Sequence, residues 1–160
     1  MMDMLQLPLN IQAVLSTTVQ FLGETFTLDD LVLHIAGRRG KPLHILEHPL
    51  DAATTGCCLA LVDADIIFIR AGLSPSRYLN TSLHECAHFL LHHIPPVTAG
   101  AEQWTFETFL EDVSFQYVRR RTSMYDKPSE DAAESLATLL TLHIANGDMS
   151  MPLFARNLYK

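Results

Sequence analysis

The sequence predicts an α+β fold in which a small antiparallel or mixed sheet packs against a helical bundle. Two helical patterns come first, three short β-rich segments follow, and helical patterns then return. The length of 160 residues fits one domain. We expect a single domain over residues 1–160, with its core at about 27–145 and a C-terminal tail at 146–160.

The first two predicted helices occupy the N-terminal quarter of the chain. One is expected over about Leu9–Leu22, where apolar residues recur on one stripe. The next is expected over Leu28–Gly37, because Thr27 can cap its N-terminus and Asp30 stands in the capping-box position. Residues 9–37 carry no Lys or Arg, so we expect this pair to pack in the core instead of binding DNA.

The period of the apolar pattern then changes to that of strands. Short strands are predicted at Leu43–Leu46, Cys57–Val62 and Ile66–Arg70. Asp63 and Asp65 interrupt the apolar residues between the last two. We expect these two strands to pair as a hairpin.

Three more helices are expected after the strands. The first begins at Ser74-Pro75, with proline in its first turn, and ends after Ile94, where Pro95-Pro96 stops it. The others are predicted at Phe106–Arg121 and from Pro128 to Asn146-Gly147.

Charge and cysteine content narrow the function classes. Eleven Lys and Arg against 18 Asp and Glu give a net charge of −7, which disfavours direct binding to nucleic acid or to anionic membranes. Three cysteines are too few for a disulfide scaffold. The chain has no basic residue before Arg38 and no apolar run of membrane-spanning length. We expect a soluble, cytoplasmic protein.

The third predicted helix carries the motif His84-Glu85-Cys86-Ala87-His88, an H-E-x-x-H pattern. Residues four apart lie one turn above each other, so both imidazoles can face one Zn²⁺ ion. Glu85 is not expected to bind the metal; it can act as the general base on metal-bound water. On a continuous helix, His92 would share the face of these histidines.

A catalytic zinc site needs a third protein ligand. The pattern H-E-x-x-H-x-x-G-x-x-H would require glycine at position 91 and histidine at position 94, where this chain has Leu91 and Ile94. The remaining candidates are two carboxylates on the last predicted helix, Glu130 and Glu134, which lie one turn apart. The residues alone leave either of them open as the ligand.

Several motifs, taken in their order along the chain, are together typical of one protein family. They are Gly40-Lys41-Pro42-Leu43, the apolar hairpin ending at Ile69, Ser74-Pro75-Ser76 leading into the H-E-x-x-H helix, Arg121 to Tyr125, and Glu130 to Glu134 followed by Leu136-Ala137. In this order, over residues 27–145, the sequence resembles the ImmA/IrrE family of zinc metallopeptidases. The H-E-x-x-H part is shared with many peptidases, whereas its pairing with E-x-x-A-E is more specific.

The resemblance implies a ligand set and a function. It makes Glu130 the third zinc ligand and gives Glu134 the position that holds a zinc-bound imidazole, although many family members have Asn or Asp there. It implies a zinc-dependent endopeptidase that cleaves a protein substrate, such as a helix-turn-helix transcriptional repressor. An acidic enzyme and a basic DNA-binding substrate would attract each other.

An alternative keeps the zinc without the catalysis. The chain would then be a catalytically silent regulatory or toxin–antitoxin-type interaction module. The intact Glu85 argues against this, because a scaffold has no need of a base there. A structural domain without metal would require both the histidine and the carboxylate clusters to be accidental.

Two further expectations concern the surroundings of the site. Tyr125 can donate a hydrogen bond to the oxyanion of the reaction. The hairpin Cys57–Arg70 immediately precedes the motif helix, so we expect it to lie beside the site. Its exposed edge would hold an extended substrate as an added strand.

Overall fold

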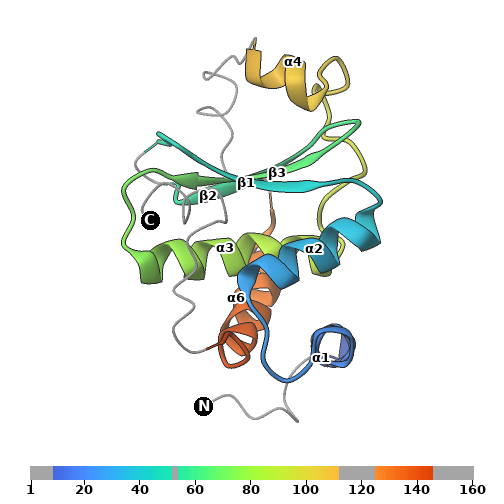
Figure 1. The fold of residues 1–160 in the computed structure, drawn as a ribbon, viewed down its shortest axis with the longest axis vertical. Coiled ribbons are helices and arrows are strands. Elements are labelled where there is room, and N and C mark those ends of the chain that lie inside the picture. The colour runs from blue at the N-terminus through green and yellow to red at the C-terminus, as the bar shows by residue number, and fades with distance from the viewer. Residues whose placement is uncertain (1–8, 52–53, 112–124, 146–160) are drawn as a thin grey trace.

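The computed structural model describes residues 9–51, 54–111 and 125–145 of the chain (Figure 1). Its elements are α1 (Leu9–Leu22), α2 (Leu28–Arg39), β1 (Leu43–His48), β2 (Gly56–Ala60), β3 (Asp65–Arg70), α3 (Pro75–Leu90), α4 (Phe106–Glu111) and α6 (Lys127–Thr141). The predicted α+β class is confirmed. No helix in these described ranges is both long enough and apolar enough to cross a membrane.

The three strands form one mixed sheet in the order β1-β3-β2. β2 and β3 pair antiparallel, with Gly56 opposite Ile69, so the predicted hairpin is confirmed. β1 runs parallel to β3, with Leu43 opposite Asp65. The central strand β3 is buried along its length except at Arg70, which fits a strand covered on both faces.

Helices cover both faces of this sheet (Figure 1). On one face, Ile67 and Ile69 of β3 join the apolar side chains of α2, α3 and α6 in the larger core. On the other face, Ile66 and Phe68 pack in a smaller core with Phe109 of α4. The small mixed sheet is therefore confirmed, whereas the packing of the helices as one bundle is not.

The capping residues predicted for α2 are confirmed. The Thr27 side chain accepts from the Asp30 N–H, and the Asp30 carboxylate accepts from the Thr27 N–H, both at 3.0 Å. The helix ends at Arg39, two residues later than predicted, because Gly40 and not Gly37 adopts the left-handed conformation, with φ 76°.

Helix α3 begins as predicted, with Ser74 as its N-cap, but it ends at Leu90 instead of Ile94. His92 has a positive φ of 61°, which turns the chain out of the helix. The expected helical face shared by His84, His88 and His92 is therefore wrong.

Helix α6 begins near the predicted position, capped by Asp126, but ends at Thr141. The chain beyond it forms a bridge in which the Phe26 N–H donates to the His143 carbonyl at 2.9 Å. The predicted helical end at Asn146-Gly147, the tail at 146–160 and residues 112–121 of the predicted fourth helix lie outside the described residues.

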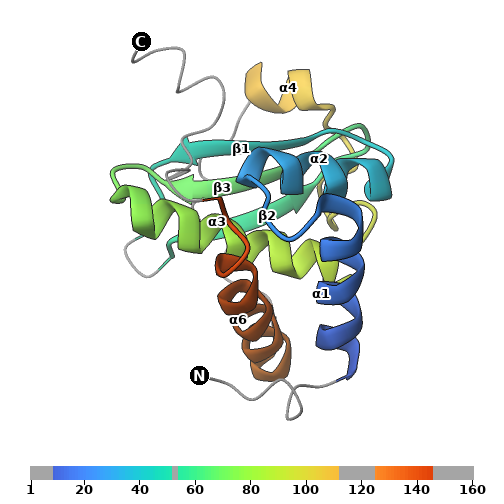
Figure 2. The same cartoon turned by 60° about the horizontal axis from the view of Figure 1, so that its bottom comes forward.

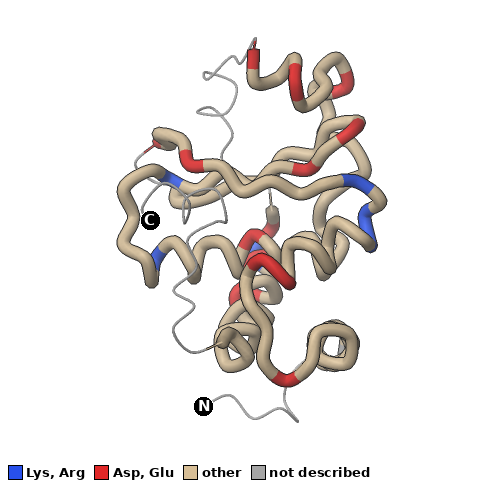
Figure 3. Tube along the Cα trace, in the orientation of Figure 1, with Lys and Arg blue, Asp and Glu red and all other residues tan. Residues whose placement is uncertain are grey.

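A buried ion pair ties the sheet to the end of α2. Asp65 is fully buried, and the Arg39 guanidinium donates to its two oxygens at 2.9 and 3.0 Å. Lys41 lies 3.3 Å from the same carboxylate. Figure 3 shows Lys and Arg positions close together at the turn between α2 and β1. This cluster fixes the start of β3 relative to α2.

Candidate metal centre

The candidate site lies where α3 packs against α6, on the side of α3 away from the sheet (Figure 2). Helix α3 carries His84, Glu85 and His88, and α6 carries Glu130 and Glu134. Small buried side chains occur on both helices, including Ala87, Ala133 and Ala137. Such residues let two helices approach closely, which brings the motif residues within reach of the carboxylates.

Three side chains converge at this crossing. The Nε2 atoms of His84 and His88 lie 3.2 Å apart. The Glu130 carboxylate reaches His84 Nε2 at 3.3 Å and His88 Nε2 at 2.9 Å. Ligands about 2.1 Å from a tetrahedral zinc ion would lie about 3.4 Å from one another, so this cluster could hold a metal ion.

The outer nitrogen of each imidazole has a partner of its own. His84 Nδ1 lies 3.0 Å from a Glu134 oxygen, and His88 Nδ1 lies 2.9 Å from His93 Nδ1. Metal-binding histidines commonly use one ring nitrogen for the metal and the other for such a partner. Both rings therefore present Nε2 to the common point, and the donor set fits a metal.

The protonation of His88 also suits metal binding. The ring is fully buried, and this burial, together with the neighbouring His84 and His93, lowers the pKa of His88. A neutral imidazole has a free lone pair on one nitrogen, which is the form that binds a metal ion.

Glu85 lies beside this cluster but points towards the sheet. Its Oε2 accepts from the Cys58 thiol at 3.0 Å, and the side chain is only 5% exposed. Burial raises the pKa of Glu85, while the hydrogen bond from Cys58 lowers it. Burial also raises the pKa of the Cys58 thiol, which keeps it protonated as the donor.

Strand β2 approaches α3 closely at Gly56. A Cβ there would lie 2.7 Å from Thr81 Cγ2 and 3.2 Å from Glu85 Oε1, which explains the glycine. The hairpin of β2 and β3 therefore lies beside the site, as predicted. The Thr55 carbonyl and the Leu61 N–H hydrogen-bond on the β3 side, so by the alternation of an antiparallel ladder the backbone groups of Gly56 and Cys58 point away from β3, to the outer edge of β2.

The far end of that edge is covered. At Ala60, the N–H donates to Thr98 Oγ1 and the carbonyl accepts from the Thr98 N–H, both at 2.8 Å. Within the described ranges, the edge groups of Gly56 and Cys58 have no backbone partner. The free edge thus begins next to Glu85.

Tyr125 covers the buried histidine. Its ring stacks on His88 with centroids 3.8 Å apart and planes 13° apart. The predicted hydrogen bond from Tyr125 to an oxyanion stays a prediction.

Two contacts at the site were not foreseen from the sequence. They are the contact of Cys58 with Glu85 and the contact of His93 with His88. The period-two pattern of β2 could have placed Cys58 on the face that meets α3. No spacing rule predicts that His93, five residues after His88, returns to the same ring.

Comparisons with known proteins identify no relative. No protein-family model matches the chain, and neither the curated proteins nor the solved structures include a match. The resemblance described above therefore depends only on the motifs quoted for it.

Proposed function

We propose that the protein is a zinc-dependent endopeptidase of the ImmA/IrrE type that cleaves a partner protein, such as a helix-turn-helix repressor. One observation carries the proposal: the ligand atoms of His84, His88 and Glu130 converge next to a buried carboxylate, Glu85, that is not one of them. This separation of metal ligands from a base is what hydrolysis of a peptide bond requires.

Two imidazoles and one carboxylate are a common ligand set of catalytic zinc, which keeps a fourth position open. His84, His88 and Glu130 would hold the ion, and Glu134 would orient His84. A bound zinc ion supplies a Lewis acid that polarises the peptide carbonyl and makes water more acidic.

Glu85 moves the proton in this proposal. Its Oε2 is held by the Cys58 thiol at 3.0 Å, which leaves Oε1 to take the proton of the attacking water. The same carboxyl group then returns the proton to the leaving amide nitrogen. Burial raises the pKa of Glu85, and a higher pKa makes the carboxylate a stronger base.

The substrate would bind along the free edge of β2. An extended peptide can hydrogen-bond to the backbone of Gly56 and Cys58 as an added strand, which would bring its scissile bond beside Glu85. The net charge of −7 favours a basic partner. A cytoplasmic location accords with the three cysteines, all of which are free.

Glu85→Gln tests this proposal, with Glu107→Gln of α4, on the opposite face of the sheet, as the matched control. The wild type and each variant are co-expressed with helix-turn-helix repressors encoded near the gene of this protein. Fragments of the repressors are identified by mass spectrometry. We expect Glu85→Gln to keep its zinc and to lose about 10²–10⁴-fold in cleavage rate, while the control cleaves like the wild type.

The opposite result would favour the interaction module. If the wild type and Glu85→Gln both bind a repressor and neither cleaves it, the peptidase proposal is wrong and the metal has a regulatory or structural role.

A further inference from the structure

The chain reverses direction directly after α3 and brings a further imidazole back to the metal-site helix. The His93 N–H donates to the His88 carbonyl at 2.9 Å, and the His92 N–H donates to the Phe89 carbonyl at 3.1 Å. These two bonds form a Schellman motif, which normally places glycine at the position that His92 occupies. Histidine adopts this left-handed conformation more readily than most other residues.

The reversal places two imidazoles in direct contact. His88 Nδ1 and His93 Nδ1 lie 2.9 Å apart, and the ring centroids are 5.1 Å apart. Tyr125 stacks on His88, so both His93 and Tyr125 hold the His88 ring in place.

At a distance of 2.9 Å between the two Nδ1 atoms, one Nδ1 must donate a hydrogen bond and the other must accept it. His88 Nε2 faces Glu130 and the other ligand atom, His84 Nε2. A metal there needs the lone pair of His88 Nε2, which puts the His88 proton on Nδ1. His93 Nδ1 is then the acceptor.

We propose that His93 is a positioning residue that fixes the tautomer and the orientation of His88 for metal binding. It accepts the Nδ1–H of His88, a role that carboxylates and backbone carbonyls usually fill. The proposal rests on the metal site of the proposed function, but it does not require that the protein cleave anything.

The two imidazole ligands are thus supported in different ways. Glu134, the partner of His84, is an acidic side chain that is 71% exposed. His93, the partner of His88, is an imidazole delivered by a strained turn, and His88 itself is fully buried. Removal of the partner should therefore cost more metal affinity at His88 than at His84.

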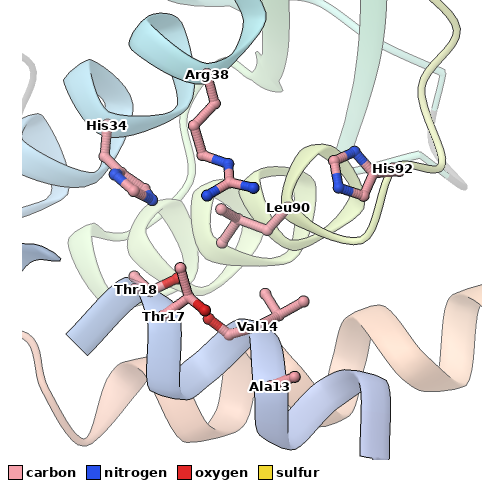
Figure 4. A pocket seen from close by; sticks show the side chains of 8 residues that line it. All are labelled: Ala13, Val14, Thr17, Thr18, His34, Arg38, Leu90 and His92. Atoms are coloured by element: carbon pink, nitrogen blue, oxygen red, sulfur yellow. The ribbon is translucent and has the colours of Figure 1, made fainter. Parts of the chain in front are cut away.

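Three substitutions test this role. His93→Phe keeps an aromatic ring but removes the acceptor, whereas His93→Asn keeps an acceptor near the position of Nδ1. His92→Asn is the matched control, because asparagine tolerates the left-handed conformation. The His92 side chain lines a separate cleft of about 120 Å³, formed with α1, α2 and the end of α3 (Figure 4).

The zinc affinity of each variant is measured by competition with a chelator, and the tautomer of His93 in the zinc-loaded wild type is read by ¹⁵N NMR. We expect His93→Phe to bind zinc about 10–100-fold more weakly. His93→Asn should recover most of the loss, and His92→Asn should match the wild type. In the zinc-loaded protein, the His93 proton should reside on Nε2 and leave Nδ1 as the acceptor, an observation that needs no variant to fold.

Several results would overturn the proposal. His93→Phe with wild-type affinity, or a His93 proton on Nδ1 in the zinc-loaded wild type, would each exclude this role while leaving the proposed peptidase untouched. A wild type that binds no zinc would overturn both proposals. A wild type that binds zinc but cleaves no protein would remove only the peptidase.

Discussion

Two polar clusters adjoin the same core, and they differ in what completes them. In the first, Asp65 is fully buried, but Arg39 and Lys41 surround its carboxylate at 2.9–3.3 Å. In the second, His84, His88 and Glu130 bring two imidazole nitrogens and a carboxylate together at 2.9–3.3 Å.

The two clusters differ in the groups that compose them. The protein itself supplies the positive charge of the Asp65 cluster, and Arg39 also donates to the carbonyls of Ile94 and Pro95. The ligand atoms of the histidine cluster are two imidazole nitrogens and a carboxylate oxygen, and its rings have their outer nitrogens occupied already. The first cluster therefore stabilises the fold without a ligand, whereas the second has the composition of a site for a metal ion.

The largest effect on stability is expected at the Asp65 cluster. Asp65→Ala leaves two cations without their buried carboxylate, so the free energy of unfolding should fall by about 3–5 kcal/mol. Urea denaturation measures this. Asp131→Ala is the control, because its ion pair with Lys127 is exposed and should contribute less than about 1 kcal/mol. Equal losses in the two variants would show that the Asp65 cluster has no special role.

A smaller effect is expected at the partner of a metal ligand. Glu134→Ala should weaken zinc binding by about tenfold, the lower end of the usual range, because Glu134 is largely exposed. The variant should still bind one zinc ion at saturation. Glu130→Ala should instead lose the metal, as measured by chelator competition. If Glu134→Ala lost the metal and Glu130→Ala only weakened its binding, Glu134 would be the ligand.

The smallest effect is expected at Glu85, whose contribution to the stability of the metal-free protein depends on pH. Burial raises the pKa of Glu85 above its ordinary value of 4.5, so the folded state holds this proton more tightly than the unfolded state. The tighter binding of this proton stabilises the folded state. The stabilisation is fully present below pH 4.5, and it is lost as the pH rises through the pKa that Glu85 has in the folded protein. Metal-free Glu85→Gln should therefore be more stable than the wild type at pH 7, by about 1 kcal/mol.

This gain should disappear towards pH 4, where Glu85 is protonated in both states. Urea denaturation of the two metal-free proteins at both pH values measures the difference. A Glu85→Gln variant that is less stable at pH 7 would mean that the charged form of Glu85 is favoured in the folded protein.

Local signals were sufficient for the parts of the fold that depend on neighbouring residues. The bounds of α1, the capping residues of α2 and the β2–β3 hairpin are as predicted. The end of α3 was mispredicted because Leu91 and Ile94 continue the apolar helical pattern. The Ile94 carbonyl instead accepts from Arg39, 55 residues earlier in the chain, and no local pattern contains that contact.

At the candidate metal centre, too, local patterns predicted some contacts and not others. The four-residue spacing of His84 and His88 indicated that they share a face. The residues alone left Glu130 and Glu134 as candidates for the third ligand, and the resemblance favoured Glu130. The contacts of Cys58 with Glu85 and of His93 with His88 depend on a strand packing and on a left-handed turn. Both arise from tertiary structure, so the sequence pattern did not reveal them.

The metal content of the purified protein shows whether His84, His88 and a carboxylate of α6 hold a zinc ion. Wild type and His88→Ala are purified without added chelator, and bound metals are quantified by plasma mass spectrometry, with His92→Asn as the control. We predict one zinc ion per chain in the wild type and in His92→Asn, and none in His88→Ala, since two protein ligands do not make a zinc site. Equal metal content in the wild type and His88→Ala, or a wild type that takes up no zinc even when it is supplied, would show that His84, His88 and Glu130 do not form a zinc site.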